Sequence, residues 1–164
     1  MDALAAIADR HSTRRFAPRA VDRSIIQQIV DAGRRAATAR NEQPWEFVIV
    51  TDPAMRRRIA DLSEFGKFIA DAPACIVVLC KDTKYYLEDG CAASQNILVA
   101  AAALGVQSCW VAGDKKPYAP AIVQLLAAPP NMKLISLLAI GYAAQADPLK
   151  PKRPLEEVLH WERF

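Results

Sequence analysis

Histidine is scarce in this chain of 164 residues, which contains only His11 and His160. Neither lies in a nucleophile motif, and no serine–histidine–acid pattern is visible, so a triad-type hydrolase is not supported. The chain also lacks GxGxxG, the Walker phosphate loop and HExxH, the motifs of dinucleotide-binding proteins, nucleoside triphosphatases and zinc proteases. We therefore assign no catalytic acid, base or nucleophile from the sequence.

Cysteines are few, and none has a metal-binding spacing. The four, Cys75, Cys80, Cys91 and Cys109, form no CxxC pair and have no histidine at ligand spacing, so we expect no zinc site and no other metal. Cys75 and Cys80 are an odd number of residues apart, which places them on opposite faces of a strand. Buried free thiols are typical of a reducing compartment, and no apolar signal core follows Met1. We expect a cytoplasmic protein.

Long hydrophobic runs are also missing. The uncharged stretch 90–113 is interrupted by Ser94, Gln95, Asn96 and Gln107. It contains no uninterrupted run of about eighteen apolar residues, the length that a membrane span requires. We expect a helix buried in a protein core or interface there, and no membrane association.

The remaining composition is that of an ordinary globular domain, with 52% hydrophobic and 24% charged residues and no repeat or linker. We expect one α+β domain over residues 1–164, with about four strands in a central mixed sheet flanked by helices. Periodicity and capping residues predict helices at 2–9, 22–35, from 52 onward, 85–104 and 117–127. Apolar runs predict strands at 45–50, 74–80, 107–111 and 133–141. The proline-containing tail from residue 147 is expected to run extended over a surface.

The basic residues form two clusters, one at each end of the chain. The first contains eight arginines among the first 40 residues, where there is no lysine: Arg10, Arg14, Arg15, Arg19, Arg23, Arg34, Arg35 and Arg40. The second contains Lys150, Lys152 and Arg153. The clusters either converge on one anion or form two solvated faces, and charge alone does not decide. Nucleic-acid binding is not expected, because the net charge is only +3 and Phe16 is the one aromatic residue among the N-terminal arginines.

Two short segments carry groups suited to an anionic, heterocyclic ligand. Residues 10–16 read Arg-His-Ser-Thr-Arg-Arg-Phe, and guanidinium groups bind phosphate bidentately while a hydroxyl and backbone N–H groups complete a cradle. Residues 41–45 read Asn-Glu-Gln-Pro-Trp, directly before a predicted strand. Amide side chains there can recognise a planar heterocycle. Taken separately, a solvated basic loop and a capped turn also explain the two segments.

Together and in this order, the segments resemble the nitroreductase family of flavoproteins. The family opens with Arg-Arg/His-Ser-x-Arg and an aromatic residue, and continues with Pro-Ser-x-x-Asn-x-Gln-Pro-Trp before the first core strand. Residues 37–45 match the second motif, except that Ala37 and Thr38 replace its proline and serine. Further matches follow in order along nearly the whole chain, at residues 72–73, 94–96, 105–110, 141–142 and 150–158. The resemblance implies a nitroreductase-like fold and an intertwined homodimer with the long helix at its seam.

The resemblance also implies a set of FMN-binding residues. Those expected to hold the phosphate and the ribityl chain are Arg10, His11, Ser12, Arg14, Lys150, Lys152 and Arg153. Those expected to approach the flavin from the partner subunit are Thr38, Arg40, Asn41 and Gln43. Ala112-Gly113 is expected to place a backbone N–H near the flavin N5. The two basic clusters would then converge on one phosphate.

The implied activity is that of an FMN-dependent oxidoreductase. Such an enzyme takes hydride from NADH or NADPH and reduces nitroaromatics, quinones or similar small acceptors by a ping-pong mechanism. The family also includes reductive dehalogenases and flavin-modifying enzymes, and a flavin-binding protein without turnover would share every phosphate contact. These remain the alternatives. The chain is short for the family and has no room for a long helical insertion, which implies an open pocket.

Overall fold

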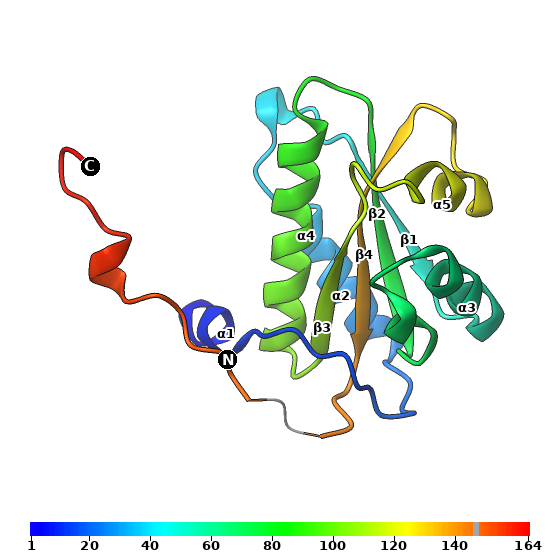
Figure 1. Cartoon of the computed structure of the whole chain (residues 1–164), viewed down its shortest axis with the longest axis horizontal. Helices are drawn as coiled ribbons and strands as arrows, with labels where there is room; N and C mark the ends of the chain where they lie inside the picture. Colours follow the sequence, from blue (N-terminus) through cyan, green and yellow to red (C-terminus); the bar gives the residue numbers. More distant parts are fainter. Residues whose placement is uncertain (146–147) are drawn as a thin grey trace.

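The computed structural model describes residues 1–145 and 148–164. In this part of the chain, a four-stranded sheet in the order β1-β2-β4-β3 forms the centre of the fold (Figure 1). The strands are β1 (Trp45–Val50), β2 (Ala74–Lys81), β3 (Gln107–Ala112) and β4 (Met132–Gly141). Their pairings are antiparallel, and a parallel bridge joins Ser12 to Ser108 at the β3 edge. The predicted α+β class is confirmed, but the four strands form an antiparallel sheet and not the predicted mixed one, because each neighbouring pair runs in opposite directions.

Helices cover both faces of the sheet. Within the described ranges, the α-helices are α1 (Ala3–Asp9), α2 (Arg23–Gly33), α3 (Pro53–Leu62), α4 (Tyr86–Ala103) and α5 (Ala119–Leu125). Three short 3-10 helices lie at Ala39–Asn41, Lys67–Ala70 and Leu155–Glu157. Two apolar clusters show that α2 and α4 pack on one face of the sheet and α3 and α5 on the other (Figure 1).

Strand β2 lies between these two layers and is buried on both faces. Its side chains alternate, so Cys75 belongs to the cluster under α3 and α5, and Cys80 belongs to the cluster under α2 and α4. The predicted opposite orientation of these two cysteines is therefore confirmed. A continuous run of buried residues from Ala74 to Cys80 explains why the sequence of this strand shows no polar alternation.

The helix ends test the predicted capping residues. Asp52 caps α3, because its Oδ2 accepts a hydrogen bond from the Met55 N–H at 2.8 Å, and Gly105 follows α4 with a φ of +72°, as expected for a residue in the left-handed conformation. Asp22 occupies the N-cap position of α2, as predicted, but its side chain makes no cap hydrogen bond, and α2 ends at Gly33 instead of at Arg35.

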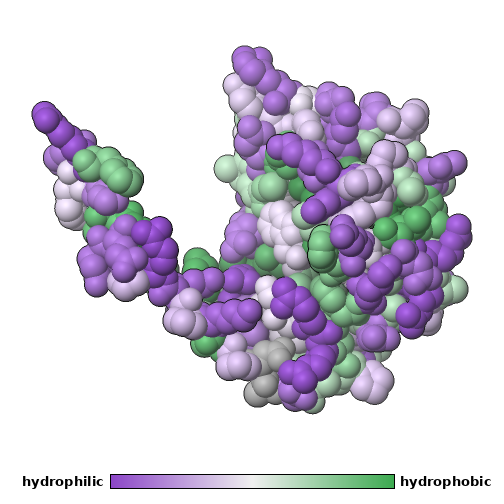
Figure 2. Space-filling model, in the orientation of Figure 1, coloured by the Kyte–Doolittle hydropathy of each residue, from purple (hydrophilic) through white to green (hydrophobic). Residues whose placement is uncertain are grey.

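Two apolar surfaces at the chain ends are exposed. In α1, the apolar side chains of Leu4 and Ile7 are open to solvent and are 79% and 54% exposed. The C-terminal arm, residues 148–164, carries apolar side chains among polar ones and extends away from the body of the fold (Figures 1 and 2), and Trp161 is 80% exposed. The predicted course of the tail over a surface is not seen within one chain for residues 155–164, which are exposed; residue 147 lies outside the described residues. No helix within the described ranges is long and apolar enough to cross a membrane.

Candidate functional site

The segment that carries the first basic motif is held along the free edge of β3. The Thr13 N–H donates to the Ser108 carbonyl at 3.0 Å, and the Ala17 N–H donates to the Tyr142 carbonyl at 2.8 Å. Thr13 is fully buried. Because both ends of the segment are tied to the sheet, the side chains between and before these points have a defined direction.

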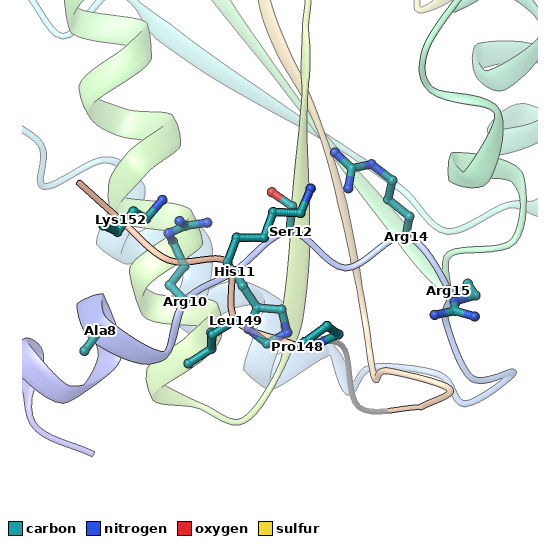
Figure 3. Close-up of a pocket in the computed structure, with 10 residues that line it drawn as sticks. Ala8, Arg10, His11, Ser12, Arg14, Arg15, Pro148, Leu149 and Lys152 are labelled. Atoms are coloured by element: carbon teal, nitrogen blue, oxygen red, sulfur yellow. The ribbon is translucent and has the colours of Figure 1, made fainter. Parts of the chain in front are cut away.

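A hollow of about 480 Å³ lies beside this segment, and both basic clusters contribute to it. Figure 3 shows Arg10 and Ser12 on the N-terminal segment facing Lys152 of the C-terminal arm. The residues that line the hollow are Ala8, Arg10, His11, Ser12, Arg14, Arg15, Pro148, Leu149, Lys150 and Lys152. Three arginines of the first cluster and two lysines of the second therefore lie around one hollow, whereas the other arginines of the two clusters do not line it.

Two residues of the predicted phosphate site, His11 and Arg153, make hydrogen bonds within the chain. The His11 ring Nδ1 lies 2.9 Å from the Asp9 carbonyl, and since a carbonyl only accepts, Nδ1 carries the hydrogen of this bond. Arg153 does not line the hollow. Its Nε donates to the Glu157 carboxylate at 3.2 Å and its Nη2 to the Glu157 carbonyl at 3.1 Å, within the arm.

A second hollow, of about 310 Å³, continues along the β3 edge, and Arg14 lines both hollows. The residues that line it are Arg14, Phe65, Phe68, Cys109, Trp110, Val111, Ala112, Lys116 and Tyr118. The Arg14 guanidinium lies 5.9 Å from the Phe68 ring centroid and the Lys116 ammonium 5.4 Å from that of Phe65, distances at which a cation is attracted to the ring face. The sequence motifs did not identify Phe65, Phe68, Lys116 or Tyr118.

The two hollows that share Arg14 form a groove along the free edge of β3. The hydrogen-bond pattern of β3 determines which backbone groups face this groove. The Gly113 N–H donates to the opposite Ile135 carbonyl at 3.0 Å, so it points into the sheet. Hydrogen-bonded and non-hydrogen-bonded pairs alternate in an antiparallel ladder, and Ala112 pairs with Ser136, so the Ala112 N–H points to the free edge. Of the predicted Ala112-Gly113 pair, Ala112 is thus the residue whose N–H is directed at the groove.

The predicted flavin-contacting loop, residues 38–43, lies at the other end of α4. Thr38 is hydrogen-bonded to Asp89 in the first turn of α4, whereas Ser12 pairs with Ser108, shortly after the end of α4. Figure 1 shows the two segments at opposite ends of this helix. At 18 residues, α4 is about 27 Å long, so one chain does not bring Thr38, Arg40, Asn41 and Gln43 together with its own phosphate hollow.

The buried cysteines have weakly acidic thiols. Burial raises the pKa of Cys109, although Arg14 and Ser12 oppose this shift. Burial also raises the pKa of Cys75 to about 12. All four cysteines are free. A protonated thiol is a poor nucleophile, so the arrangement does not indicate cysteine chemistry. Among the described residues, no group of three or more potential metal ligands occurs.

Known proteins resemble this chain in both sequence and fold. The model of the "Nitroreductase family" matches residues 7–64. A relative from Archaeoglobus fulgidus, provisionally named as an NADH dehydrogenase/NAD(P)H nitroreductase, is 34% identical over 86% of this chain and 85% of its own length. A crystal structure from Parabacteroides distasonis with the same provisional name has a TM-score of 0.93 and 28% identity, covering 99% of this chain and 98% of that one. A provisionally assigned nitroreductase from Desulfovibrio desulfuricans, solved in complex with FMN, has a TM-score of 0.88 and 29% identity, covering 100% of this chain and 98% of that one.

Proposed function

This chain belongs to the nitroreductase family, and we propose that it is an FMN-dependent oxidoreductase that takes hydride from NADH or NADPH and reduces nitroaromatics, quinones or similar small acceptors. The observation that carries the proposal is the convergence of the two basic clusters on one hollow at the free edge of β3. A relative with the same fold binds FMN.

The donor set of the hollow fits a terminal phosphate. Arg10 and Arg14 contribute planar guanidinium groups, Lys150 and Lys152 contribute ammonium groups, and Ser12 contributes a hydroxyl. A dianionic phosphate accepts charge-assisted hydrogen bonds from all three kinds of donor. These residues would hold the FMN phosphate, which orients the rest of the cofactor along the groove.

The groove along β3 fits the remainder of the cofactor. Arg14 connects the phosphate hollow with the second hollow, and the Ala112 N–H provides a donor at its far end. When bound, FMN supplies the hydride acceptance and release. The chain contributes fixed positive charge and N–H donors, which favour the negative charge that develops on reduction.

We extend the proposal to a homodimer in which each flavin is bound by both chains. The phosphate hollow and the loop 38–43 lie at opposite ends of α4, so a second chain is needed to bring both to one cofactor. The exposed apolar residues of α1 and of the arm provide the surface that such a partner would cover. All of residues 1–164 would act as one domain, and the four free cysteines favour a reducing cytoplasmic environment.

Absorbance spectroscopy of the purified protein tests the function. We expect a yellow protein whose flavin is released by heat and elutes as FMN on chromatography, and whose flavin band bleaches on anaerobic titration with NADH or NADPH. FAD, or no flavin, contradicts the proposal. Bound FMN that NAD(P)H does not reduce indicates a flavin-binding protein without turnover, and steady turnover with halogenated but not nitroaromatic acceptors indicates a specialised dehalogenase.

A further inference from the structure

The buried acid Asp89 is joined to the loop 38–43 by two hydrogen bonds. It lies in the first turn of α4 and is 4% exposed. Its Oδ2 accepts from the Thr38 hydroxyl at 2.8 Å, and its Oδ1 accepts from the Ala39 N–H at 3.1 Å. Both carboxylate oxygens therefore accept hydrogen bonds from the beginning of the loop. Such bonds hold the loop firmly, because hydrogen bonds to a charged acceptor are stronger than those between neutral groups.

The Thr38 hydroxyl extends this restraint to the end of the loop. Its oxygen accepts from the Gln43 N–H at 3.1 Å, while its hydrogen is donated to Asp89. A hydroxyl has one hydrogen to donate, so Thr38 has none left for a flavin. The chain of contacts from Asp89 through Thr38 to Gln43 closes the loop instead.

The loop needs an external restraint because its backbone is strained. Arg40, Asn41 and Gln43 have φ values of 54°, 57° and 48°, in the left-handed region that is costly for residues other than glycine. Such conformations persist where the surrounding structure over-determines them, and they are concentrated at ligand-binding sites. These three residues belong to the set, with Thr38, that the family resemblance implies for contact with the flavin from the partner subunit.

We propose that Asp89 is a positioning residue for flavin binding: through Thr38 it fixes the conformation in which Arg40, Asn41 and Gln43 meet the cofactor. This inference rests on the proposed function. Asp89 does not itself touch the cofactor, because its carboxylate is buried and both of its oxygens are occupied within the chain. Thr38, predicted as a cofactor contact, becomes the connection between Asp89 and the loop.

Two substitutions remove the restraint in different ways, and one neighbour provides a matched control. Asp89→Asn keeps the size of the side chain but replaces one acceptor oxygen with a donor. Thr38→Val keeps the shape and removes the hydroxyl. Glu88→Gln makes the same charge change as Asp89→Asn in the same helical turn, at an exposed side chain.

The first measurement is backbone hydrogen exchange in the FMN-free protein. We expect the amides of Ala39 and Gln43 to exchange about tenfold faster or more in Asp89→Asn and Thr38→Val, because a hydrogen bond to each is lost or weakened. Exchange in the four strands should be unchanged, and Glu88→Gln should behave as the unmodified protein. A role in overall stability alone would instead accelerate exchange throughout the sheet.

The second measurement is FMN binding by fluorescence titration, with the midpoint potential of the bound flavin. Both variants should bind FMN about ten- to a hundredfold more weakly, and the double variant should be no weaker than the worse single one, because both changes interrupt the same chain of contacts. The potential should become more negative, since fewer donors then stabilise the anionic reduced flavin.

The outcomes separate this inference from the proposed function. A loosened loop with unchanged FMN affinity and unchanged potential overturns the positioning role, as does unchanged exchange at Ala39 and Gln43. If the unmodified chain binds no FMN, the proposed function fails, and the exchange rates alone decide whether Asp89 holds the loop.

Discussion

The position of the two halves of the proposed flavin site at opposite ends of α4 predicts complementation between two differently damaged subunits. Arg10→Glu places a carboxylate in the phosphate hollow, and Asn41→Ala removes an amide from the loop at the far end of the helix. In a two-fold dimer, each site takes the hollow of one chain and the loop of the other. A mixed dimer of these variants then has one doubly damaged site and one intact site.

The magnitude of the recovered activity follows from random pairing. After an equal mixture is unfolded and refolded, about half of the dimers are mixed and each has one of its two sites intact, so about a quarter of the unmodified activity returns. The parent homodimers should be nearly inactive at an FMN concentration equal to the Kd of the unmodified protein, because a site that binds about a hundredfold more weakly is then only about 1% occupied, against about half for an intact site. NAD(P)H oxidation with a quinone acceptor measures the activity, and size-exclusion chromatography confirms that dimers persist.

A second mixture provides the matched control. Arg10 and Lys152 line the same hollow of the same chain, so mixing Arg10→Glu with Lys152→Glu damages every site once and no activity should return. The reasoning is refuted if the Arg10→Glu and Asn41→Ala mixture stays as inactive as its parents while mass spectrometry of tagged subunits shows that they exchange. In that case both segments serve one chain's own site.

Three further predictions follow from the site and the arm. Arg10→Ala should weaken FMN binding by about ten- to a hundredfold, whereas Arg23→Ala, at the exposed start of α2, should leave the Kd unchanged; an equal effect of both in fluorescence titration contradicts the site. Burial raises the pKa of the Cys75 thiol to about 12, so this thiol stays protonated at pH 8. A thiolate-specific reagent should therefore label half-exposed Cys91 long before Cys75, as measured by mass spectrometry. Labelled protein should retain NAD(P)H turnover, and its loss would point to a required thiol. Removal of residues 155–164, most of the exposed arm, should shift the protein from dimer to monomer on size-exclusion chromatography, and a truncated chain that remains dimeric excludes the arm from the interface.

Elements whose signal is local were predictable from the sequence. The strand at β2 follows from an apolar run between Pro73 and Lys81, and α3 follows from Asp52-Pro53. The convergence of the basic clusters was implied by the family resemblance, and the hollow that both clusters line agrees with it. In these cases each residue type acts through its immediate neighbours or through a motif that extends over several positions.

Features that depend on distant partners were not predictable. Asp89 is one of two neighbouring acids, with Glu88, in the first turn of α4. Its partner Thr38 is 51 residues away in the chain, so no spacing identifies it. The left-handed φ of Arg40 carries no sequence signal, because no glycine marks it. The exposed face of α1 reads as a core-facing stripe from Leu4 and Ile7, since periodicity shows that a face is apolar but not which chain covers it.

The location of the site on an edge strand explains why a short chain without a catalytic motif can build it. An edge strand has unpaired N–H and C=O groups along one side, which invite pairing with other chains unless something occupies them. Along β3, the Thr13 N–H donates a hydrogen bond to the Ser108 carbonyl at one end, and the Tyr118 hydroxyl donates one to the Ala112 carbonyl at the other. Ala112, whose N–H points outward, lines the same hollow as the cations Arg14 and Lys116. The carbonyl oxygens at both ends are thus satisfied within the chain, while an N–H donor remains directed at the groove. We therefore expect the edge to favour a ligand that brings negative charge and acceptor atoms, as the proposed flavin mononucleotide does.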